Sequence, residues 1–489
     1  MKVGNVPRRN LPFLAAVLAL CACLLLLGLF RLERYLGGRR AWRAWKAAQE
    51  AAGMDFDPAS CLPPAVPDPR NFAAAPILAA NPRRTRRWSS ALADLPTPGM
   101  GDWQSGLPED FSAVDVVLRD QDPELSLAPF AADLEALADA ARRPASQLQL
   151  ADGSRQPAPE FSERLLALGR LLQRRALVRL HAGRPVPALE DVLTALAVAR
   201  HLQDEPYPPV QLARLFWLDM FMQPIWEGLA SRAWDEPRLA RLEAALEPQD
   251  LVASFALAQR YRRCLDSASL EAKPPIARSA HWQDWATARW LSGVYRSKYG
   301  AALRQDQDRA RIQAALAAPR IRLDRLDLTP PSGSGGRKPA FLHPAAAAAR
   351  FPSGFLPRLA RVQAGLDQAM VVCALERWRL RHGRYPRDLQ ELVPAYRSAL
   401  PQDRLMGGLL AYASTGRTFH LAAAGWPWRR EQDQAQAEAG DPSEAPAGGN
   451  DGPQPWPWAA WPVTPRRPPG AAPRPTRDFS QPGFLLERL

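Results

Sequence analysis

Histidines are the side chains in this sequence whose chemistry is easiest to assess. His281 and Asp284 have a spacing that places both on one helix face, but a metal site needs further ligands and none is positioned nearby. His382 falls in the last turn of a predicted helix, where an imidazole favours the helix dipole and caps backbone carbonyls. We therefore predict no metal ligand and no cofactor, and a structural role for His382.

Acidic pairs and standard motifs give no better catalytic candidates. Glu190–Asp191 and Asp204–Glu205 are adjacent in the chain, so the two acids of each pair point to different faces and suit acid–base chemistry poorly. The sequence has no Gly-x-Ser-x-Gly, no His-Glu-x-x-His and no glycine-rich phosphate loop. We predict no catalytic residue. This favours a protein without enzymatic activity but leaves the question open.

Tryptophans support the alternative, an enzyme that binds or processes an envelope glycan. Such an enzyme would need an aromatic cleft joined to carboxylates such as Glu227, Asp235 or Asp284. The candidate aromatic surface consists of Trp282, Trp285 and Trp290. Earlier tryptophans of the same set are Trp217, Trp226 and Trp234. Because large aromatic residues more often fill a core, the glycan-binding groove stays the second hypothesis.

The most specific pattern lies near the C-terminus. It reads Ala374-Leu375-Glu376-Arg377-Trp378-x3-His382-Gly383-Arg384-Tyr385-Pro386-x2-Leu389-x-Glu391-Leu392-Val393-Pro394. Glycine best tolerates a left-handed helix C-cap, the first proline can open a short helix, and the last one stops it. The residues that define this motif are Gly383, Tyr385, Pro386, Leu389, Leu392 and Pro394.

This motif resembles the segment after the long helix of type II secretion pseudopilins. It is also similar to the C-terminal module of membrane-anchored envelope proteins of unassigned role from planctomycete- and verrucomicrobium-type bacteria. The segment Val66-Pro-Asp-Pro-Arg-Asn-Phe72 resembles that second group too. However, Arg9-Asn10-Leu11-Pro12 is not a pseudopilin processing site, and Asp403-Arg404 replaces the family's Asp-Pro. The resemblance implies the shape of the module, not assembly into a fibre.

A second local pattern lies in the middle of the chain. Gly183-x4-Ala188-Leu189-x-Asp191-x3-Ala195-Leu196 resembles one tetratricopeptide-type hairpin, whose small residues let two helices approach. No second copy follows, and a solenoid needs several. An ordinary helical hairpin is therefore the alternative.

The membrane prediction rests on Leu11–Phe30, which reads LPFLAAVLALCACLLLLGLF and has no charge. At about 1.5 Å per residue this segment matches a hydrocarbon core of about 30 Å. A cleaved signal peptide has a shorter apolar stretch, and lipoprotein processing before Cys23 would leave Leu24–Phe30 as an apolar stub. We predict an uncleaved single-pass anchor.

Two sequence signals predict opposite orientations for this anchor. The basic C-flank favours a cytoplasmic body by the positive-inside rule; it comprises Arg31, Arg34, Arg39, Arg40, Arg43 and Lys46. Arginine is common throughout the chain, however, and a short N-terminal stub is typical of signal anchors. We therefore predict a bacterial inner-membrane protein with an extracytoplasmic body. Trp42 and Trp45 suit the lipid headgroup zone.

The net charge of +13 raises the question of nucleic acid as a partner. Lysine is rare among the 63 basic residues, and the arginines are spread along predicted helices beside acids, as on solvated faces. Nucleic acid is therefore disfavoured, and a contiguous arginine face would be needed to support it. We expect the membrane and other envelope proteins as partners; the sequence does not indicate the oligomeric state.

Helical spacing and proline content define a mainly α protein. Phe161, Leu165, Leu168 and Leu172 form one apolar stripe, Leu212–Trp226 reads as a core helix, and Asp235-Glu236-Pro237 opens another. The predicted segments are a stub and anchor (1–30), a juxtamembrane helix (31–56), an irregular proline-rich strap (57–125), a helical domain (126–328), a linker (329–344), a helix plus β-hairpin module (345–425) and a disordered tail (426–489). Within the tail, Trp456, Trp458 and Trp461 are the residues that could pack back onto the body. We expect a non-enzymatic assembly or interaction protein of the cell envelope.

Overall fold

The structure is a computed structural model that describes residues 11–90, 127–148, 159–271, 355–402, 410–422 and 460–461, with several positions between 299 and 314. The chain forms two compact units. The first comprises residues 1–60, 262–311 and 331–350, and the second comprises residues 61–261, 312–330 and 351–489. The mainly α prediction is confirmed.

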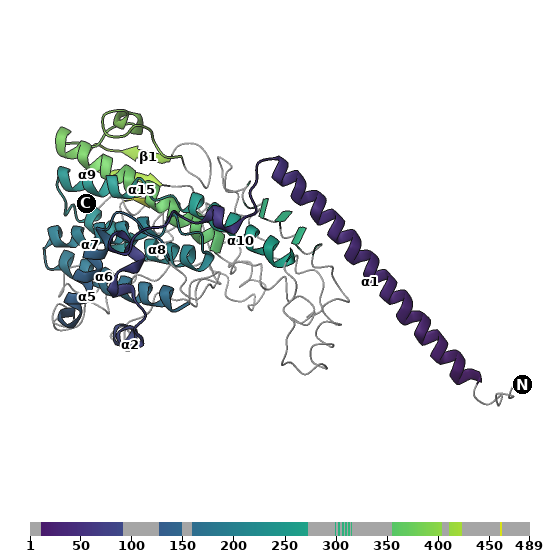
Figure 1. Cartoon of the computed structure of the whole chain (residues 1–489). Helices are drawn as coiled ribbons and strands as arrows, with labels where there is room; N and C mark the ends of the chain where they lie inside the picture. Colours follow the sequence, from purple (N-terminus) through teal and green to yellow (C-terminus); the bar gives the residue numbers. More distant parts are fainter. Residues whose placement is uncertain are drawn as a thin grey trace, which may run out of the picture. The chain divides into compact units, whose positions relative to one another are not determined.

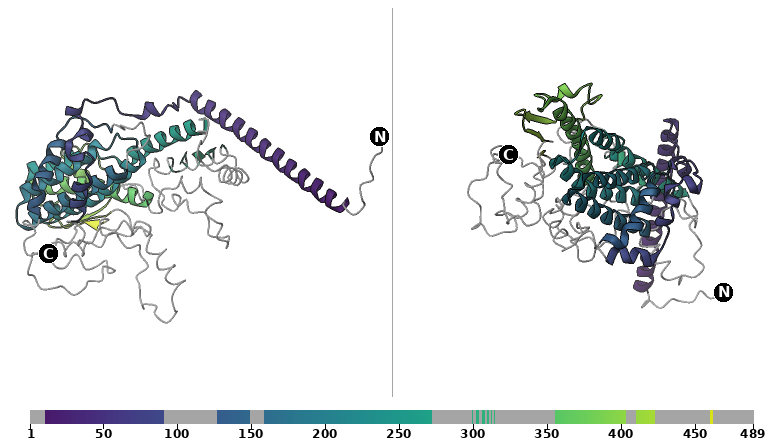
Figure 2. Two further views of the ribbon diagram at one scale, coloured as in Figure 1. Left: turned by 60° about the horizontal axis from the view of Figure 1, so that its bottom comes forward. Right: turned by 90° about the vertical axis from the view of Figure 1, so that its left-hand side faces the viewer.

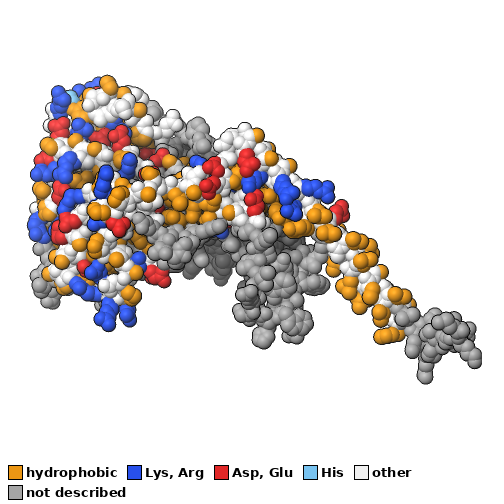
Figure 3. All heavy atoms as spheres, in the orientation of Figure 1, with side chains coloured by type: hydrophobic (Ala, Val, Ile, Leu, Met, Phe, Trp, Pro, Cys, Tyr) orange, Lys and Arg blue, Asp and Glu red, His pale blue; other side chains and the backbone are white. Residues whose placement is uncertain are grey.

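The first unit begins with α1, one continuous helix over Leu11–Ala51 (Figure 1). Its apolar window is not buried at all, and Leu25 and Leu26 are each 65% exposed. Figure 3 shows apolar side chains around the N-terminal part of α1 and Lys and Arg side chains toward its other end. Within the described residues, α1 is the one helix long and apolar enough to cross a membrane.

The C-terminal part of α1 is covered by protein. Trp42 is 3% exposed and lies against Trp45, with ring centroids 4.7 Å apart; Trp45 in turn packs against Phe56 at 5.6 Å. Lys46 Nζ lies 2.7 Å from Glu271 Oε1, at the end of α10 (Leu251–Glu271). We expected Trp42 to face the lipid headgroups, but its indole is buried inside the first unit.

In the second unit the predicted strap is more regular than a coil. The strap contains four short 3-10 helices among its described residues: η2 (Pro58–Cys61), most of which belongs to the first unit, and then η3 (Asp68–Arg70), η4 (Phe72–Ala74) and η5 (Pro76–Leu78). They are followed by α2 (Pro82–Ser90). Asn81 accepts the backbone N–H of Arg84 and Pro82 occupies the first helical position, which explains where α2 begins.

The helical body follows in chain order. Its elements are η7 (Ala128–Phe130), α5 (Ala131–Ala141), α6 (Pro159–His181), α7 (Pro185–His201), α8 (Pro208–Ala230), α9 (Glu236–Leu246) and α10. α6 and α7 pack as a hairpin around Gly183, whose positive φ of 67° suits glycine. α8 lies against α6, α7 and α15 and is buried along most of its length, so it is the predicted core helix. α9 begins after Asp235, whose side chain accepts from Arg238 N, as predicted.

The C-terminal module starts with α15 (Phe355–His382), the predicted helix. Two strands follow η9 (Leu389–Leu392): β1 (Ala411–Ser414) and β2 (Phe419–Ala422) form an antiparallel hairpin. β3 (Ala460–Trp461) adds to β2, which places one short piece of the predicted disordered tail in the sheet. Other residues of that tail lie outside the described ranges.

α15 belongs to the same unit as the helical body. Two views show it alongside α9 (Figures 1 and 2), and the two helices are in contact. Arg377 of α15 and Arg397 each lie 2.8 Å from the Glu243 carboxylate of α9. The sequence predicted a domain boundary at the linker, but in the structure the long helix of the module completes the helical core. Its apolar residues, such as Leu366, Val371 and Leu375, are fully buried.

Candidate functional site

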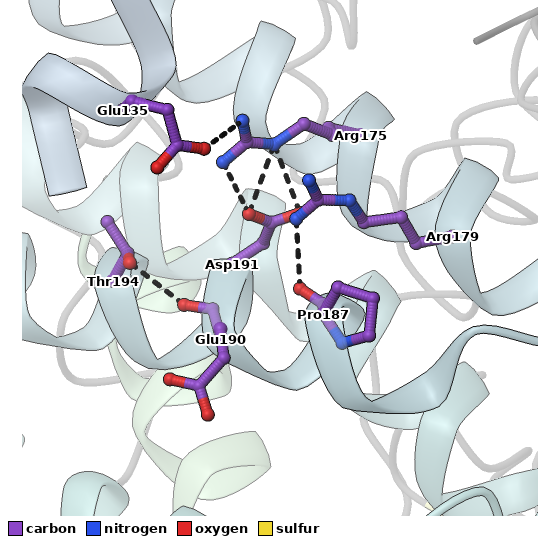
Figure 4. Close-up of polar contacts among 7 residues, drawn as sticks. All are labelled: Glu135, Arg175, Arg179, Pro187, Glu190, Asp191 and Thr194. Atoms are coloured by element: carbon purple, nitrogen blue, oxygen red, sulfur yellow. Dashed lines mark hydrogen bonds and ion pairs between the residues drawn. The ribbon is translucent and has the colours of Figure 1, made fainter. Parts of the chain in front are cut away.

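A buried polar cluster joins α6 and α7 (Figure 4). Arg175 and Arg179 are four residues apart on α6, so both guanidinium groups reach one carboxylate, that of Asp191 on α7. Arg175 Nη2 lies 2.6 Å from Asp191 Oδ1, and Arg179 Nη1 lies 2.8 Å from Asp191 Oδ2. Glu135 of α5 adds a contact of 3.0 Å to Arg175. The Asp191 side chain is 2% exposed, so its carboxylate is buried between the helices, and the cluster reaches solvent at Glu135.

Electrostatics support this structural role. Burial raises the pKa of Asp191, and the two guanidinium groups oppose that shift by favouring the carboxylate. Glu190 lies on a different face of α7, half exposed, and pairs with Arg241 of α9 at 2.7 Å. The two adjacent acids therefore have different partners and different exposure, as expected for neighbours that point to different faces of a helix.

A second cluster holds the strap on the body. The side chain of Asn71 is fully buried; its Oδ1 accepts the N–H of Gln147 at 2.9 Å, and its Nδ2 donates to the Gln147 carbonyl at 2.8 Å. Phe72 N donates to Ala145 O at 2.8 Å. The Phe72 ring stacks on His201 of α7, with centroids 4.6 Å apart and planes 4° from parallel. We call Asn71, Phe72 and residues 145–148 the strap seat.

Glu205 supports the strap seat from the α7–α8 connection. It is 1% exposed, and its Oε1 accepts the N–H of Leu148 at 2.8 Å. Burial raises the pKa of Glu205 to about 7, and the hydrogen bond from Leu148 opposes the shift. Burial lowers the pKa of His201, whose Nε2 donates to Ala141 O at 3.0 Å. Two titratable groups, Glu205 and His201, thus border the strap seat, and burial shifts their pKa values in opposite directions.

The C-terminal motif builds the turn between α15 and the β-hairpin. Gly383 takes a φ of 71° and donates its N–H to Arg379 O at 2.8 Å, which is the predicted left-handed end of the helix. Tyr385 N donates to Gly416 O at 2.8 Å, so the motif is hydrogen-bonded to the hairpin loop. His382 contacts the Trp378 carbonyl at 3.0 Å, in the capping position expected for it.

The remaining motif residues are mostly buried. The Tyr385 hydroxyl donates to Glu376 Oε1 at 2.5 Å, and burial, with the nearby Glu376 carboxylate, raises the tyrosine pKa. Pro386, Leu389 and Leu392 are buried, whereas Pro394 is exposed and follows a cis peptide bond. In place of a helix opened by Pro386, the structure has η9 with Asp388 and Glu391 forming a capping box. The motif therefore shapes the module and leaves no open polar site.

The three earlier tryptophans of the candidate set belong to the core. Trp217 and Trp226 are completely buried, and Trp234 is 4% exposed. Trp217 donates to Ala195 O at 2.8 Å, and the Trp234 ring packs so tightly on Gly228 that a Cβ there would lie 2.1 Å from it. These three rings are not available to stack on a sugar. The candidate aromatic surface Trp282, Trp285 and Trp290 lies outside the described residues, as do His281 and Asp284.

Arginines gather on α2, which sequence reasoning did not single out. The helix carries Arg83, Arg84, Arg86 and Arg87 and has no acidic residue. Trp88 fixes it to the body: its ring is fully buried, and Nε1 donates to Asp133 Oδ2 of α5 at 2.8 Å. The Asn-Pro start at residue 81 was a usable signal for this helix.

Candidate metal centres are absent from the described part of the chain, where no group of three His, Cys, Asp or Glu side chains is arranged to hold an ion. Comparison with protein-family models, with curated proteins and with solved structures finds no match to this chain.

Proposed function

We propose that this chain is a single-pass, non-enzymatic assembly or interaction protein of a bacterial cell envelope. The observation that carries the proposal is the contrast between α1 and the body. α1 exposes a continuous run of large apolar side chains. The described residues of the second unit expose few large apolar side chains, namely Leu62, Val186 and Leu380. An exposed apolar run is favourable in a bilayer and costly in water.

The buried polar groups support a role that does not need catalysis. Asp191 and Glu205 are both held by partners inside the body, and neither faces a described opening. Groups with shifted pKa values mark active sites only when they also lie in a cleft. Here the same groups connect helices to each other and the strap to the body, which is what a rigid interaction module requires.

We place the body outside the cytoplasm. The resemblance of the C-terminal motif to envelope proteins favours this orientation, whereas the basic C-flank favours the reverse. The partner we expect is another envelope protein or a second copy of this chain.

The test is the state of the full chain after extraction from its membrane in mild detergent. We expect light scattering to give more than one protein chain per particle, or chemical cross-links that join the second unit to one reproducible protein. As the control, Asp191→Asn should keep the protein in the membrane but weaken the association, because it damages the body and not α1. A monomeric full chain without such cross-links contradicts the proposal.

A further inference from the structure

The arginines of α2 differ in their partners from the many arginines of the second unit that pair with a carboxylate. Unlike the buried Arg214, which among the described residues also bonds to uncharged oxygens, three of the four are exposed. The arginines of the second unit that contact a described carboxylate include Arg142, Arg175, Arg179, Arg238, Arg241, Arg358, Arg377, Arg379 and Arg397. No ion pair among the described residues includes an arginine of α2. Their hydrogen-bond partners are backbone carbonyls, those of Pro76, Pro82 and Pro129. Within the described ranges, no carboxylate therefore neutralises the positive charge of α2.

This arrangement is unfavourable for the helix itself. Arg83 and Arg84 lie in the first turn, where the helix dipole favours negative charge. Arg83 and Arg87 are four residues apart, and Arg83 and Arg86 are three apart, so like charges are neighbours on the helix surface. The first turn also lacks an acidic residue that would offset this repulsion. An external anion would relieve both effects.

The arginines are also positioned to receive such an anion. Arg83, Arg86 and Arg87 are exposed, and Arg84 is partly exposed. Figure 3 shows Lys and Arg side chains gathered at the edge of the body where α2 lies. Each guanidinium group carries five N–H donors, and Arg84 and Arg86 each use one in the bonds described. Guanidinium groups can bind phosphate oxygens with two parallel hydrogen bonds. The hydrogen bond from Trp88 to Asp133 fixes the orientation of α2 on the body, so its arginines stay on the surface.

We propose that α2 is a docking surface for the anionic phospholipid headgroups of the membrane that holds α1. This inference rests on the anchoring role of α1 in the proposed function. The covalent link between the helices supports it, because α1 ends at Ala51 and α2 begins at Pro82, so the same chain brings α2 to a bilayer at high effective concentration. Phosphate-bearing lipids supply the negative charge that the helix lacks.

The experiment measures hydrogen exchange of the full chain in nanodiscs made of phosphatidylcholine alone or of phosphatidylcholine mixed with phosphatidylglycerol. We expect backbone amides of Pro82–Ser90 to exchange more slowly in the anionic discs, and added salt to remove the difference. Because each arginine near an anionic surface contributes about fivefold, Arg83→Gln with Arg86→Gln should weaken the docking equilibrium about 25-fold. Both side chains are exposed, so this variant keeps its fold.

The matched control is Arg142→Gln with Arg241→Gln. It removes the same charge from two arginines that already have carboxylate partners, Asp139 and Glu190, and it should leave the lipid-dependent protection of α2 unchanged. If the control weakens protection as much as the α2 variant does, net charge and not α2 is responsible, and the proposal is overturned.

Exchange within Leu11–Phe30 reports separately on α1. If α1 is protected in both discs and α2 exchanges equally in both, the docking proposal is overturned while the anchor stands. If α1 itself is unprotected, the anchoring role fails first and docking falls with it. Protection of α2 by added single-stranded DNA in phosphatidylcholine discs, without any response to phosphatidylglycerol, would assign the surface to nucleic acid instead.

Discussion

Arginine side chains have opposite surroundings in the α6–α7 cluster and on α2. In the cluster, Arg175 and Arg179 share the buried carboxylate of Asp191, so their charges are spent on holding helices together. On α2, the arginines are exposed and bond to backbone carbonyls, so their charges stay available outside. Buried ion pairs are costly to break, whereas unpaired surface charges contribute little to stability. The comparison separates arginines that build the fold from arginines that act on the surroundings.

The largest expected effect comes from breaking the buried cluster. Asp191→Asn removes the carboxylate and leaves two guanidinium groups without it, which should lower the free energy of unfolding by about 3–5 kcal/mol. Chemical denaturation monitored by tryptophan fluorescence measures this change. Glu190→Gln is the control, because Glu190 and Arg241 are both about half exposed and such a pair is worth about 1 kcal/mol or less. Equal losses in the two variants would erase the distinction between buried and exposed pairs.

Glu205 extends the comparison to a buried acid without an arginine. Its folded pKa of about 7 exceeds the ordinary value of 4.5, so the folded state binds the proton more tightly. The associated stability is fully present below pH 4.5 and is lost as the pH rises through about 7, with a maximum change of about 3 kcal/mol.

Unfolding at a series of pH values tests this prediction. Glu205→Gln keeps an acceptor for Leu148 N–H but cannot titrate, so subtracting its curve from that of the parent chain isolates Glu205. His201 acts in the opposite direction, because its lowered pKa makes stability fall as the pH drops below 6.5. The prediction fails if the difference between the curves is flat between pH 4.5 and 7.

The C-terminal motif should show an intermediate effect. Tyr385→Phe removes the hydroxyl that donates to the buried Glu376 at 2.5 Å, and we expect a loss of about 1–2 kcal/mol in the free energy of unfolding. Tyr412→Phe removes a hydroxyl that donates to the Pro386 carbonyl at 2.9 Å, and it should cost less because that acceptor is uncharged. A larger loss for Tyr412→Phe would mean that the hairpin, not the motif, stabilises the module.

The smallest effect on stability should come from α2. Arg83→Gln with Arg86→Gln should change the free energy of unfolding by about 0.5 kcal/mol or less, and a slight gain is expected because like-charge repulsion decreases. Chemical denaturation of the detergent-solubilised chain measures it. A loss comparable to that of Asp191→Asn would place these arginines in the fold and not on its surface.

Local signals explain which elements were predictable. Asp235-Glu236-Pro237 marked the start of α9, Gly383 marked the end of α15, and the apolar run at Leu212–Trp226 marked the core helix. Each of these depends on neighbours in sequence. The α2 helix carried a comparable signal in Asn81 and Pro82, which proline-rich surroundings obscured.

Long-range contacts explain the rest. Asn71 and Gln147 are 76 residues apart in sequence, so nothing near Asn71 indicates its buried partners. In the sequence, Asp191 is only one of two adjacent acids, and its partners Arg175 and Arg179 are apparent only when α6 packs against α7. The packing of α15 on α9 likewise depends on Glu243, which meets Arg377 only in the folded chain.

Protease accessibility in intact spheroplasts tests the central claim most directly. We predict that a protease added outside digests the second unit of the full chain, and that the fragment containing α1 then resists extraction from the membrane at alkaline pH. Protection of the second unit until the membrane is permeabilised would show a cytoplasmic body and contradict the proposed orientation. Release of the α1 fragment by alkaline extraction would contradict membrane anchoring itself.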